Sequence, residues 1–202
     1  MKTWLVGCVG LLLSISVFAD SDPKAVVEPL KIARDTFYKD VSKFQDGKLT
    51  EEELVARISE QFAPLINDRT VALRVMGRFA RQATEAERDR FTGRLELSLV
   101  DAYARGLAAY GGEQIVLPEE GVILKPGRAM VEARLESPGR EALPIQFALG
   151  FERDKGWMVE NVVIAGINLG LTLRNQFADL VKSTGSVSGA IDSWSFESVS
   201  AN

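Results

Sequence analysis

The sequence contains no histidine and only one cysteine, Cys8, and these absences restrict the chemistry open to it. Histidine is the usual general base near neutral pH, so a catalytic site of that kind is excluded. One thiol excludes a disulfide framework within the chain and thiolate-rich zinc sites. The nucleophile elbow G-x-S-x-G, the P-loop and the G-x-G-x-x-G fingerprint are also missing. We therefore expect no enzyme, no metal site and no cofactor.

Basic residues are outnumbered as well, with 24 Lys and Arg against 28 Asp and Glu, for a net charge of −4. Nucleic-acid binding depends on basic surface that neutralises phosphates, so we expect no nucleic-acid partner. Paired carboxylates such as Glu85/Glu87 and Glu119/Glu120 fall at expected helix starts and turns. Capping and solvation explain them there, which leaves no candidate for carboxylate catalysis.

The N-terminal segment has the layout of a secretory signal peptide. Lys2 is followed by the apolar run Trp4–Phe18, and Val17 and Ala19 occupy the −3 and −1 positions of a cleavage site. We expect residues 1–19 to be removed and residues 20–202 to form one domain, which places the protein in the periplasm.

Two alternatives were weighed for this segment. A membrane anchor needs about 20 apolar residues, and the run is shorter than that. Leu5-Val6-Gly7-Cys8 has the form of a lipoprotein box, but no apolar stretch precedes it.

Apolar residues recur every three or four positions through the first half of the chain, which predicts amphipathic helices. Pro29 suits the first turn of a helix that Asp46-Gly47 ends. A capping box at Thr50 opens a second helix, which ends at Pro64.

Two further helices complete the N-terminal half. Asn67 or Asp68 can cap a third helix that carries Phe79. A second capping box at Thr84 opens the longest helix, which we expect to run to about Tyr110.

The hydrophobic period then changes to two, which indicates strands. Alternation over 129–135 and 145–151, a tight turn at 154–156 and an apolar run over 157–165 predict three strands. The segment 115–124, broken near 118–121, is the fourth. A further helix follows Gly166 and ends at Gly185, and Ser186 can cap a short last one before a loose tail after about residue 196. The predicted fold class is α+β: a helical half, a four-stranded antiparallel meander, then C-terminal helices.

The C-terminal part of the chain resembles a known signature. The run from Trp157 through Ala165-Gly166-Ile167-Asn168-Leu169, followed by Leu173-Arg174-Asn175-Gln176-Phe177, looks like the C-terminal signature of the MlaC, or toluene-tolerance auxiliary, family. Ala83-Thr84 to Phe91 and Tyr103-Ala104 to Tyr110 resemble the start and end of its long helix. The sequence departs from the pattern at Leu173, often Tyr, and at Asn161, often Asp.

This resemblance implies a periplasmic phospholipid-binding protein with an NTF2-like curved sheet closed by helices. It implies three partners: phospholipid as cargo, an outer-membrane lipoprotein–porin complex, and an inner-membrane ABC transporter with an MCE-domain subunit. A carrier of this kind maintains outer-membrane lipid asymmetry. We expect a monomer.

A lipid carrier needs an apolar cavity, and the inward faces of the predicted elements supply candidates for its walls. The candidate lipid-binding residues are Val75, Phe79, Leu95, Leu99, Tyr103, Val131, Ala133, Leu135, Ile145, Phe147, Leu149, Ile164, Ile167, Leu169 and Phe177. Periodicity alone fits ordinary core packing equally, because a filled core and a cavity wall share one pattern. Only the resemblance favours the cavity.

Arginines cluster between the third and fourth predicted helices: Arg69, Arg74, Arg78, Arg81, Arg88, Arg90 and Arg94. They could bind a lipid phosphate or an acidic partner, but a solvated face paired with nearby acids is the favoured interpretation. Arg174, in the matched signature, could contact the lipid head group or fix the last helix to the sheet.

Three other functions stay open. The same fold could carry another apolar molecule such as a hopanoid, or it could be a periplasmic adaptor without a ligand. An NTF2-like enzyme would need polar groups inside the cavity, where only Tyr103, Asn161 and Arg174 are candidates.

Overall fold

The computed structural model describes residues 22–108 and 110–195, apart from the side chains at 101 and 103–108. The predicted signal peptide and the predicted loose tail lie outside these residues. The helices are α1 (Pro23–Gln45), α2 (Glu51–Phe62), η1 (Ala63–Leu65), α3 (Asp68–Met76), η2 (Gly77–Arg81), α4 (Glu85–Ala108), α5 (Leu169–Thr184) and α6 (Val187–Asp192). The strands are β1 (Gln114–Val116), β2 (Val122–Lys125), β3 (Arg128–Glu136), β4 (Leu143–Glu152), β5 (Gly156–Ile164) and β6 (Ile167–Asn168).

The helix boundaries follow the capping residues. The boxes at Thr50 and Thr84 form as predicted, each with a reciprocal hydrogen bond to the glutamate three residues later. Asn67 caps α3 by accepting from the Thr70 N–H at 3.1 Å. Gly185, in the left-handed conformation, ends α5.

Two helix predictions were wrong. The first helix begins at Pro23, not Pro29, because Asp22 caps it and Pro23 occupies its first turn. Pro29 therefore lies inside α1, where it leaves one carbonyl of the preceding turn without its usual donor. The third helix stops at Met76, since Gly77 takes a positive φ of 57°, and Phe79 lies on η2.

The sheet is antiparallel, as predicted, but over the residues that the structure describes it has six strands instead of four. Its order is β1-β3-β4-β5-β6, and β2 pairs with the same edge of β3 as β1 does. The predicted first strand is thus two strands, separated by the loop that contains Pro118. A turn at Ala165 and Gly166, both with positive φ, adds the short β6.

A β-bulge interrupts the pairing of β4 with β5. Asn161 pairs with Ala148 and Val159 with Leu149, so Glu160 is an extra residue without a partner in β4. This insertion reverses the alternation of side chains along β5. Val159 and Val162 consequently lie on one face of β5, and Glu160 and Asn161 lie on the other. The two pairs line two different cavities.

Three apolar clusters hold the layers together. The helical cluster joins α3, α4, α5 and α6, with Phe91 stacked edge-on against Phe177 and Trp194 at centroid distances of 4.7 and 5.1 Å. In the sheet cluster, α1 packs against β3, β4 and β5, and Val27 and Val131 are among the buried residues at this contact. The third joins α1 to α2.

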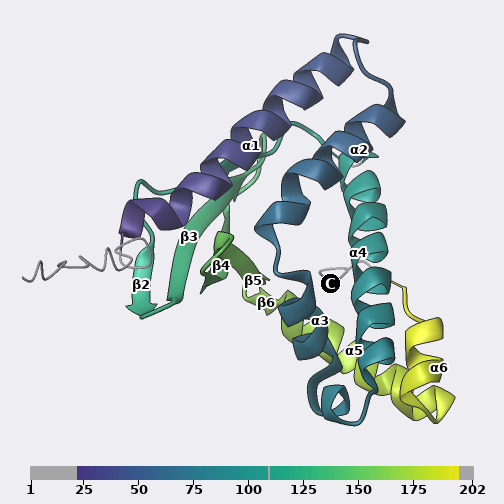
Figure 1. Ribbon diagram of the computed structural model, residues 1–202. Coiled ribbons are helices and arrows are strands. Elements are labelled where there is room, and N and C mark those ends of the chain that lie inside the picture. The colour runs from purple at the N-terminus through teal and green to yellow at the C-terminus, as the bar shows by residue number, and fades with distance from the viewer. Residues whose placement is uncertain (1–21, 109, 196–202) are drawn as a thin grey trace, which may run out of the picture.

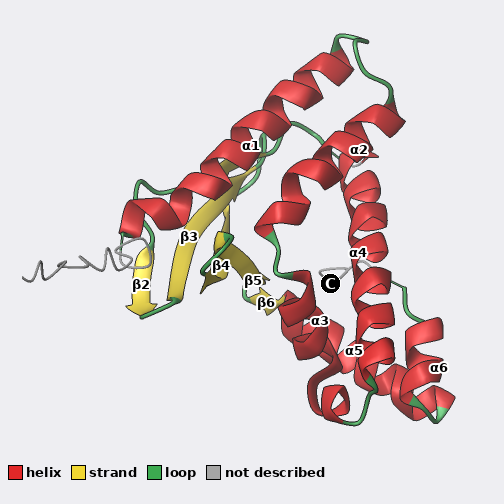
Figure 2. Ribbon diagram, in the orientation of Figure 1, coloured by secondary structure: helices red, strands yellow, loops and turns green. Residues whose placement is uncertain are grey.

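The layers are segregated in space, as the sequence order predicts. Figures 1 and 2 show α1 lying across the sheet, while α3, α5 and α6 gather at the opposite end beside the long α4. The molecule is therefore an α+β fold in which the sheet lies between α1 and the C-terminal helices. Among the described residues, no helix is both long and apolar enough to span a bilayer.

Glycine substitutions test the bulge. A methyl group added at Gly150 would overlap the Glu160 carboxylate and the Arg128 guanidinium. We expect Gly150→Ala to lower the free energy of unfolding by about 1–3 kcal/mol, the usual cost of overpacking. Gly93→Ala is the matched control, since Gly93 lies within α4 with open space around it. The free energy of unfolding of that variant should rise by up to about 1 kcal/mol. Urea unfolding checks both, and equal stability of Gly150→Ala and wild type would contradict the assigned packing.

Candidate functional site

An apolar cavity of about 280 Å³ lies between α1 and the sheet. We call it the inner cavity. α1 supplies one wall, the segment from Phe62 to Ile66 a second, and β1, β4 and β5 the floor. The lining residues are Leu30, Ala33, Arg34, Phe37, Tyr38, Phe62, Leu65, Ile66, Ile115, Leu117, Phe147, Val159 and Val162.

The polar atoms of this cavity are bonded to neighbours. The Tyr38 hydroxyl accepts from the Ile115 N–H at 2.6 Å, which also ties α1 to β1. Arg34 donates from Nε to Asp35 at 2.8 Å. With these groups satisfied, the remaining lining is hydrocarbon, which suits an apolar ligand and offers no catalytic constellation.

An outer groove of about 640 Å³ runs between α1 and the α2–η1 segment. Ala33 and Leu65 line both the outer groove and the inner cavity, so they form the partition between them. Ile32 lies in this groove with 59% of its surface exposed. The two spaces together give an apolar route from the surface to the sheet.

Asp40 joins α1 to α2 through Gln61, a residue that lines the outer groove. Its carboxylate is buried and accepts from Lys43 Nζ and from Gln61 Nε2, each at 2.7 Å. The hydrogen bond from Lys43 is the main cause that lowers the pKa of Asp40, against the effect of burial. The carboxylate therefore ties α1 to α2 at neutral pH, and the tie weakens in acid as pH falls through the lowered pKa.

The predicted site residues divide among several places. Of them, Phe147 lines the inner cavity. Val75, Leu95 and Phe177 are buried in the helical cluster, and Phe79 packs against it. Val131 and Leu149 belong to the sheet cluster.

Among the predicted residues whose side chains are described, the remaining ones do not line the inner cavity. Ala133 and Ile145 are buried opposite each other on β3 and β4. Leu135, Ile164, Ile167 and Leu169 are partly buried and do not line the cavity. Tyr103 lies on α4, and its side chain is outside the described residues.

Sequence reasoning missed most of the cavity wall. Leu30 and Phe37 belong to the apolar periodicity that predicts the first helix, but this periodicity does not show that their side chains line a cavity. Leu65 and Ile66 carried no periodic signal, because they follow Pro64 in an irregular segment. Their position comes from pairing, since Asn67 N donates to Val159 O at 3.2 Å and Ile66 bridges to Val159.

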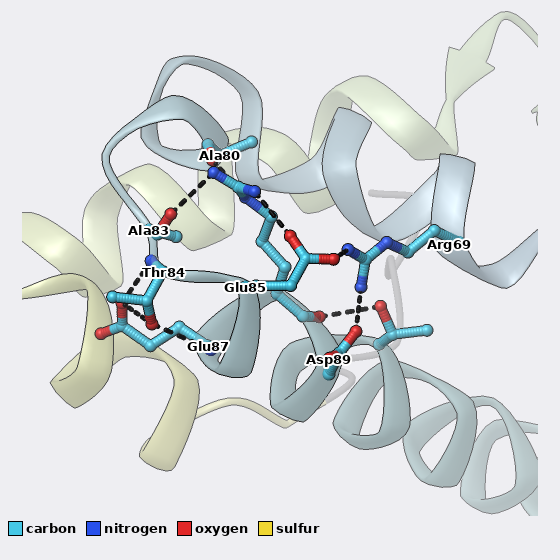
Figure 3. A network of polar contacts seen from close by, with 9 residues as sticks. Arg69, Ala80, Ala83, Thr84, Glu85, Glu87 and Asp89 are labelled. Atoms are coloured by element: carbon cyan, nitrogen blue, oxygen red, sulfur yellow. Dashed lines mark hydrogen bonds and ion pairs between the residues drawn. The ribbon is translucent and has the colours of Figure 1, made fainter.

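Most of the clustered arginines are paired with acids, as the favoured interpretation predicts. Figure 3 shows Arg69 between Glu85 and Asp89. Arg88 binds Glu85 and also donates to the carbonyls of Ala80 and Ala83 at 2.8 Å. Arg90 donates a hydrogen bond to the Ser188 hydroxyl of α6, and Arg94 donates one to the carbonyl of Asp192, the last residue of α6. These arginines fix α3 and α6 to α4. Arg78, Arg81 and Arg174 instead line a separate groove, together with Arg74.

A smaller cleft of about 230 Å³ is lined by Leu99 and by three acids, Glu60, Asp68 and Glu96. Burial raises the pKa of Asp68 to about 6, and the Glu96 carboxylate adds to the rise, while Lys155 opposes it. Among the described residues, no group of three or more acids is placed to hold a metal ion.

Asp68→Asn tests this environment. A folded-state pKa above the ordinary 3.8 means that the folded protein binds the proton more tightly than the unfolded chain. Stability should therefore fall as pH rises through about 6. The position of Asp68 in the first turn of α3 reduces this loss.

We expect the variant to have a higher melting temperature than wild type at pH 8. Below pH 3.8, the ordinary pKa of the carboxyl, this difference should disappear. Asp179→Asn, on the exposed side of α5, controls for the removal of one negative charge. A gain that is the same at both pH values would contradict the raised pKa.

Comparisons with known proteins were made on sequence and on fold. Residues 35–195 match the family model described as MlaC protein. A toluene tolerance protein, Ttg2D from Pseudomonas putida, is 32% identical over 123 residues, which cover 59% of this chain. The match spans 55% of that relative, so the chain covers about half the length of the curated relative.

A solved structure has the same fold. It is a phospholipid-binding protein from Ralstonia solanacearum in complex with a phospholipid, with a TM-score of 0.67 and 20% identity. The likeness covers 85% of this chain and 93% of that one. At this identity the likeness establishes the fold, and it confirms the predicted α+β class.

Proposed function

Since the chain belongs to the MlaC family, as its resemblance predicted, we propose that it is a periplasmic phospholipid carrier. The observation that carries this proposal is the inner cavity, an apolar space enclosed by α1, η1 and the sheet. The solved relative that holds a phospholipid and the toluene tolerance relative support the same class of cargo.

The physical task of such a carrier is to replace water around acyl chains. A two-chain lipid has roughly 30 methylene-type groups, and each contributes about 0.8 kcal/mol on leaving water. The hydrocarbon lining of the inner cavity supplies that contact, whereas Arg34, at its edge, is the one charged side chain in the lining. Acyl chains therefore supply most of the binding energy, and the head group adds little.

The cavity must widen to hold a whole lipid. At about 280 Å³ it lies just below the roughly 300–1,000 Å³ of typical ligand pockets. The outer groove offers the extra space, because it adjoins the inner cavity at Ala33 and Leu65, which line both. Outward movement of α1 would join the two spaces, and Pro29 weakens the hydrogen bonding of that helix where it borders the groove.

We further propose the place of this carrier between the two membranes. It would exchange lipid with an outer-membrane lipoprotein–porin complex and with an inner-membrane ABC transporter that has an MCE-domain subunit. This exchange would maintain the lipid asymmetry of the outer membrane. The route to the periplasm would be the signal peptide predicted over residues 1–19.

Organic extraction tests the cargo directly. Protein purified from a Gram-negative host should release phospholipid, detected by mass spectrometry with near one-to-one stoichiometry to lipid phosphorus. An apolar molecule without phosphorus, such as a hopanoid, would replace this proposal with a different carrier. Protein that is repeatedly empty would exclude a carrier and leave an adaptor.

Filling the cavity tests the site. Ala33→Phe puts a large side chain into the partition between groove and cavity, so we expect co-purified phospholipid to fall at least about tenfold, as a clash that costs about 1.4 kcal/mol would produce. Ala56→Phe adds the same volume on the exposed side of α2 and should keep wild-type lipid content.

Thermal unfolding of both variants shows whether they are folded. A folded Ala33→Phe variant with undiminished lipid would place the cargo elsewhere in the molecule.

A further inference from the structure

A basic groove of about 610 Å³ lies where α3 and η2 meet α5 and β5. Four arginines line it: Arg74 from α3, Arg78 and Arg81 from η2, and Arg174 from α5. One carboxylate, Glu160, faces them. This concentration of positive charge stands out in a chain whose net charge is −4.

Three of these arginines have no acidic partner among the described residues. No hydrogen bond or ion pair holds Arg81 or Arg174 in that part of the chain, and Arg78 lies over the Phe79 ring at 4.8 Å. All three are exposed. They differ in this respect from Arg69, Arg88 and Arg90, which pair with nearby acids. The unpaired guanidinium groups are thus free to bind an anion.

The floor of the groove is rigid. Glu160 is 6% exposed and accepts from Arg74 at 2.6 Å and from Arg128. Beside it, Asn161 accepts from the Gly170 N–H and donates to Asn168, both at 3.0 Å. Asn168 caps α5 by accepting from Leu171 N. The helix N-terminus is therefore satisfied by protein, which leaves the arginines as the anion-binding groups.

The position of the groove argues against the head group of the cargo. Because of the bulge, Glu160 and Asn161 face the groove while Val159 and Val162 face the inner cavity. Acyl chains in the inner cavity would lie on the opposite face of β5 from these arginines, which favours a different ligand for the groove.

We propose that the basic groove is a docking site for an acidic segment of a partner protein. Carboxylates match guanidinium groups in geometry as well as charge, and several can be bound at once by arginines on different elements. Leu171, 53% exposed on the rim beside Arg174, adds the apolar contact that protein interfaces combine with arginine. The charge also speeds encounter with the partner.

The test uses the full chain and a labelled octaglutamate peptide, with octaglutamine as the neutral probe. The variant Arg78→Gln/Arg81→Gln removes two unpaired charges, and we expect it to weaken octaglutamate binding at least about tenfold by fluorescence anisotropy. Arg140→Gln/Arg153→Gln is the matched control, since both residues are exposed on turns outside the groove. It should bind like wild type.

Three outcomes would overturn the proposal. Equal weakening in both double variants would mean diffuse charge attraction, and octaglutamine binding as tight as octaglutamate would mean that charge plays no part. If octaglutamate does not bind, while inorganic phosphate or vesicles of phosphatidylglycerol and phosphatidylethanolamine bind wild type but not Arg78→Gln/Arg81→Gln, the groove is a phosphate site. Co-purified phospholipid is measured in the same variants and should stay unchanged, so the result is independent of the carrier proposal.

Discussion

One extra residue in β5 sets the arrangement of the whole molecule. Glu160 has no partner in β4, and the bulge it creates turns neighbouring side chains to opposite faces of the sheet. Val159 and Val162 reach the apolar cavity under α1, while Glu160 and Asn161 reach the arginines of α3 and α5. A regular strand would place Val159 and Val162 on opposite faces and break the floor of the cavity.

The bulge is stable because the exposed arginines satisfy a buried charge. A lone carboxylate as deeply buried as Glu160 would be costly, but Arg74 and Arg128 both bind it. These two arginines come from different layers, a helix and the sheet. The same ion pairs that permit the bulge therefore join α3 to β3, and they orient one of the side chains of the basic groove.

Local signals made much of the fold predictable. The caps at Thr50, Asn67 and Thr84 depend on neighbours within three residues, so the sequence contains all that determines them. The start of α1 was misplaced because two prolines, Pro23 and Pro29, suit a first helical turn equally well, and only Asp22 distinguishes them.

The site was harder to predict for a physical reason. Its walls depend on long-range pairing, such as Asn67 with Val159, and on a bulge at Glu160 that the sequence pattern of the strand does not predict. Alternation in the sequence places Phe147 on the inward face of its strand, where it lines the inner cavity, but alternation does not distinguish a filled face from a hollow one. The sequence also does not identify the unpaired arginines, because ion pairing depends on the folded arrangement and not on spacing along the chain.

The separation of the apolar clusters has a mechanical consequence. The helical cluster, with Phe91, Phe177 and Trp194 in close contact, includes none of the residues that line the inner cavity. Displacement of α1 would disturb the contacts of the sheet cluster and leave that aromatic centre intact. The helical cluster would therefore keep its packing whatever position α1 took, so one part of the chain forms a scaffold that is independent of the cavity.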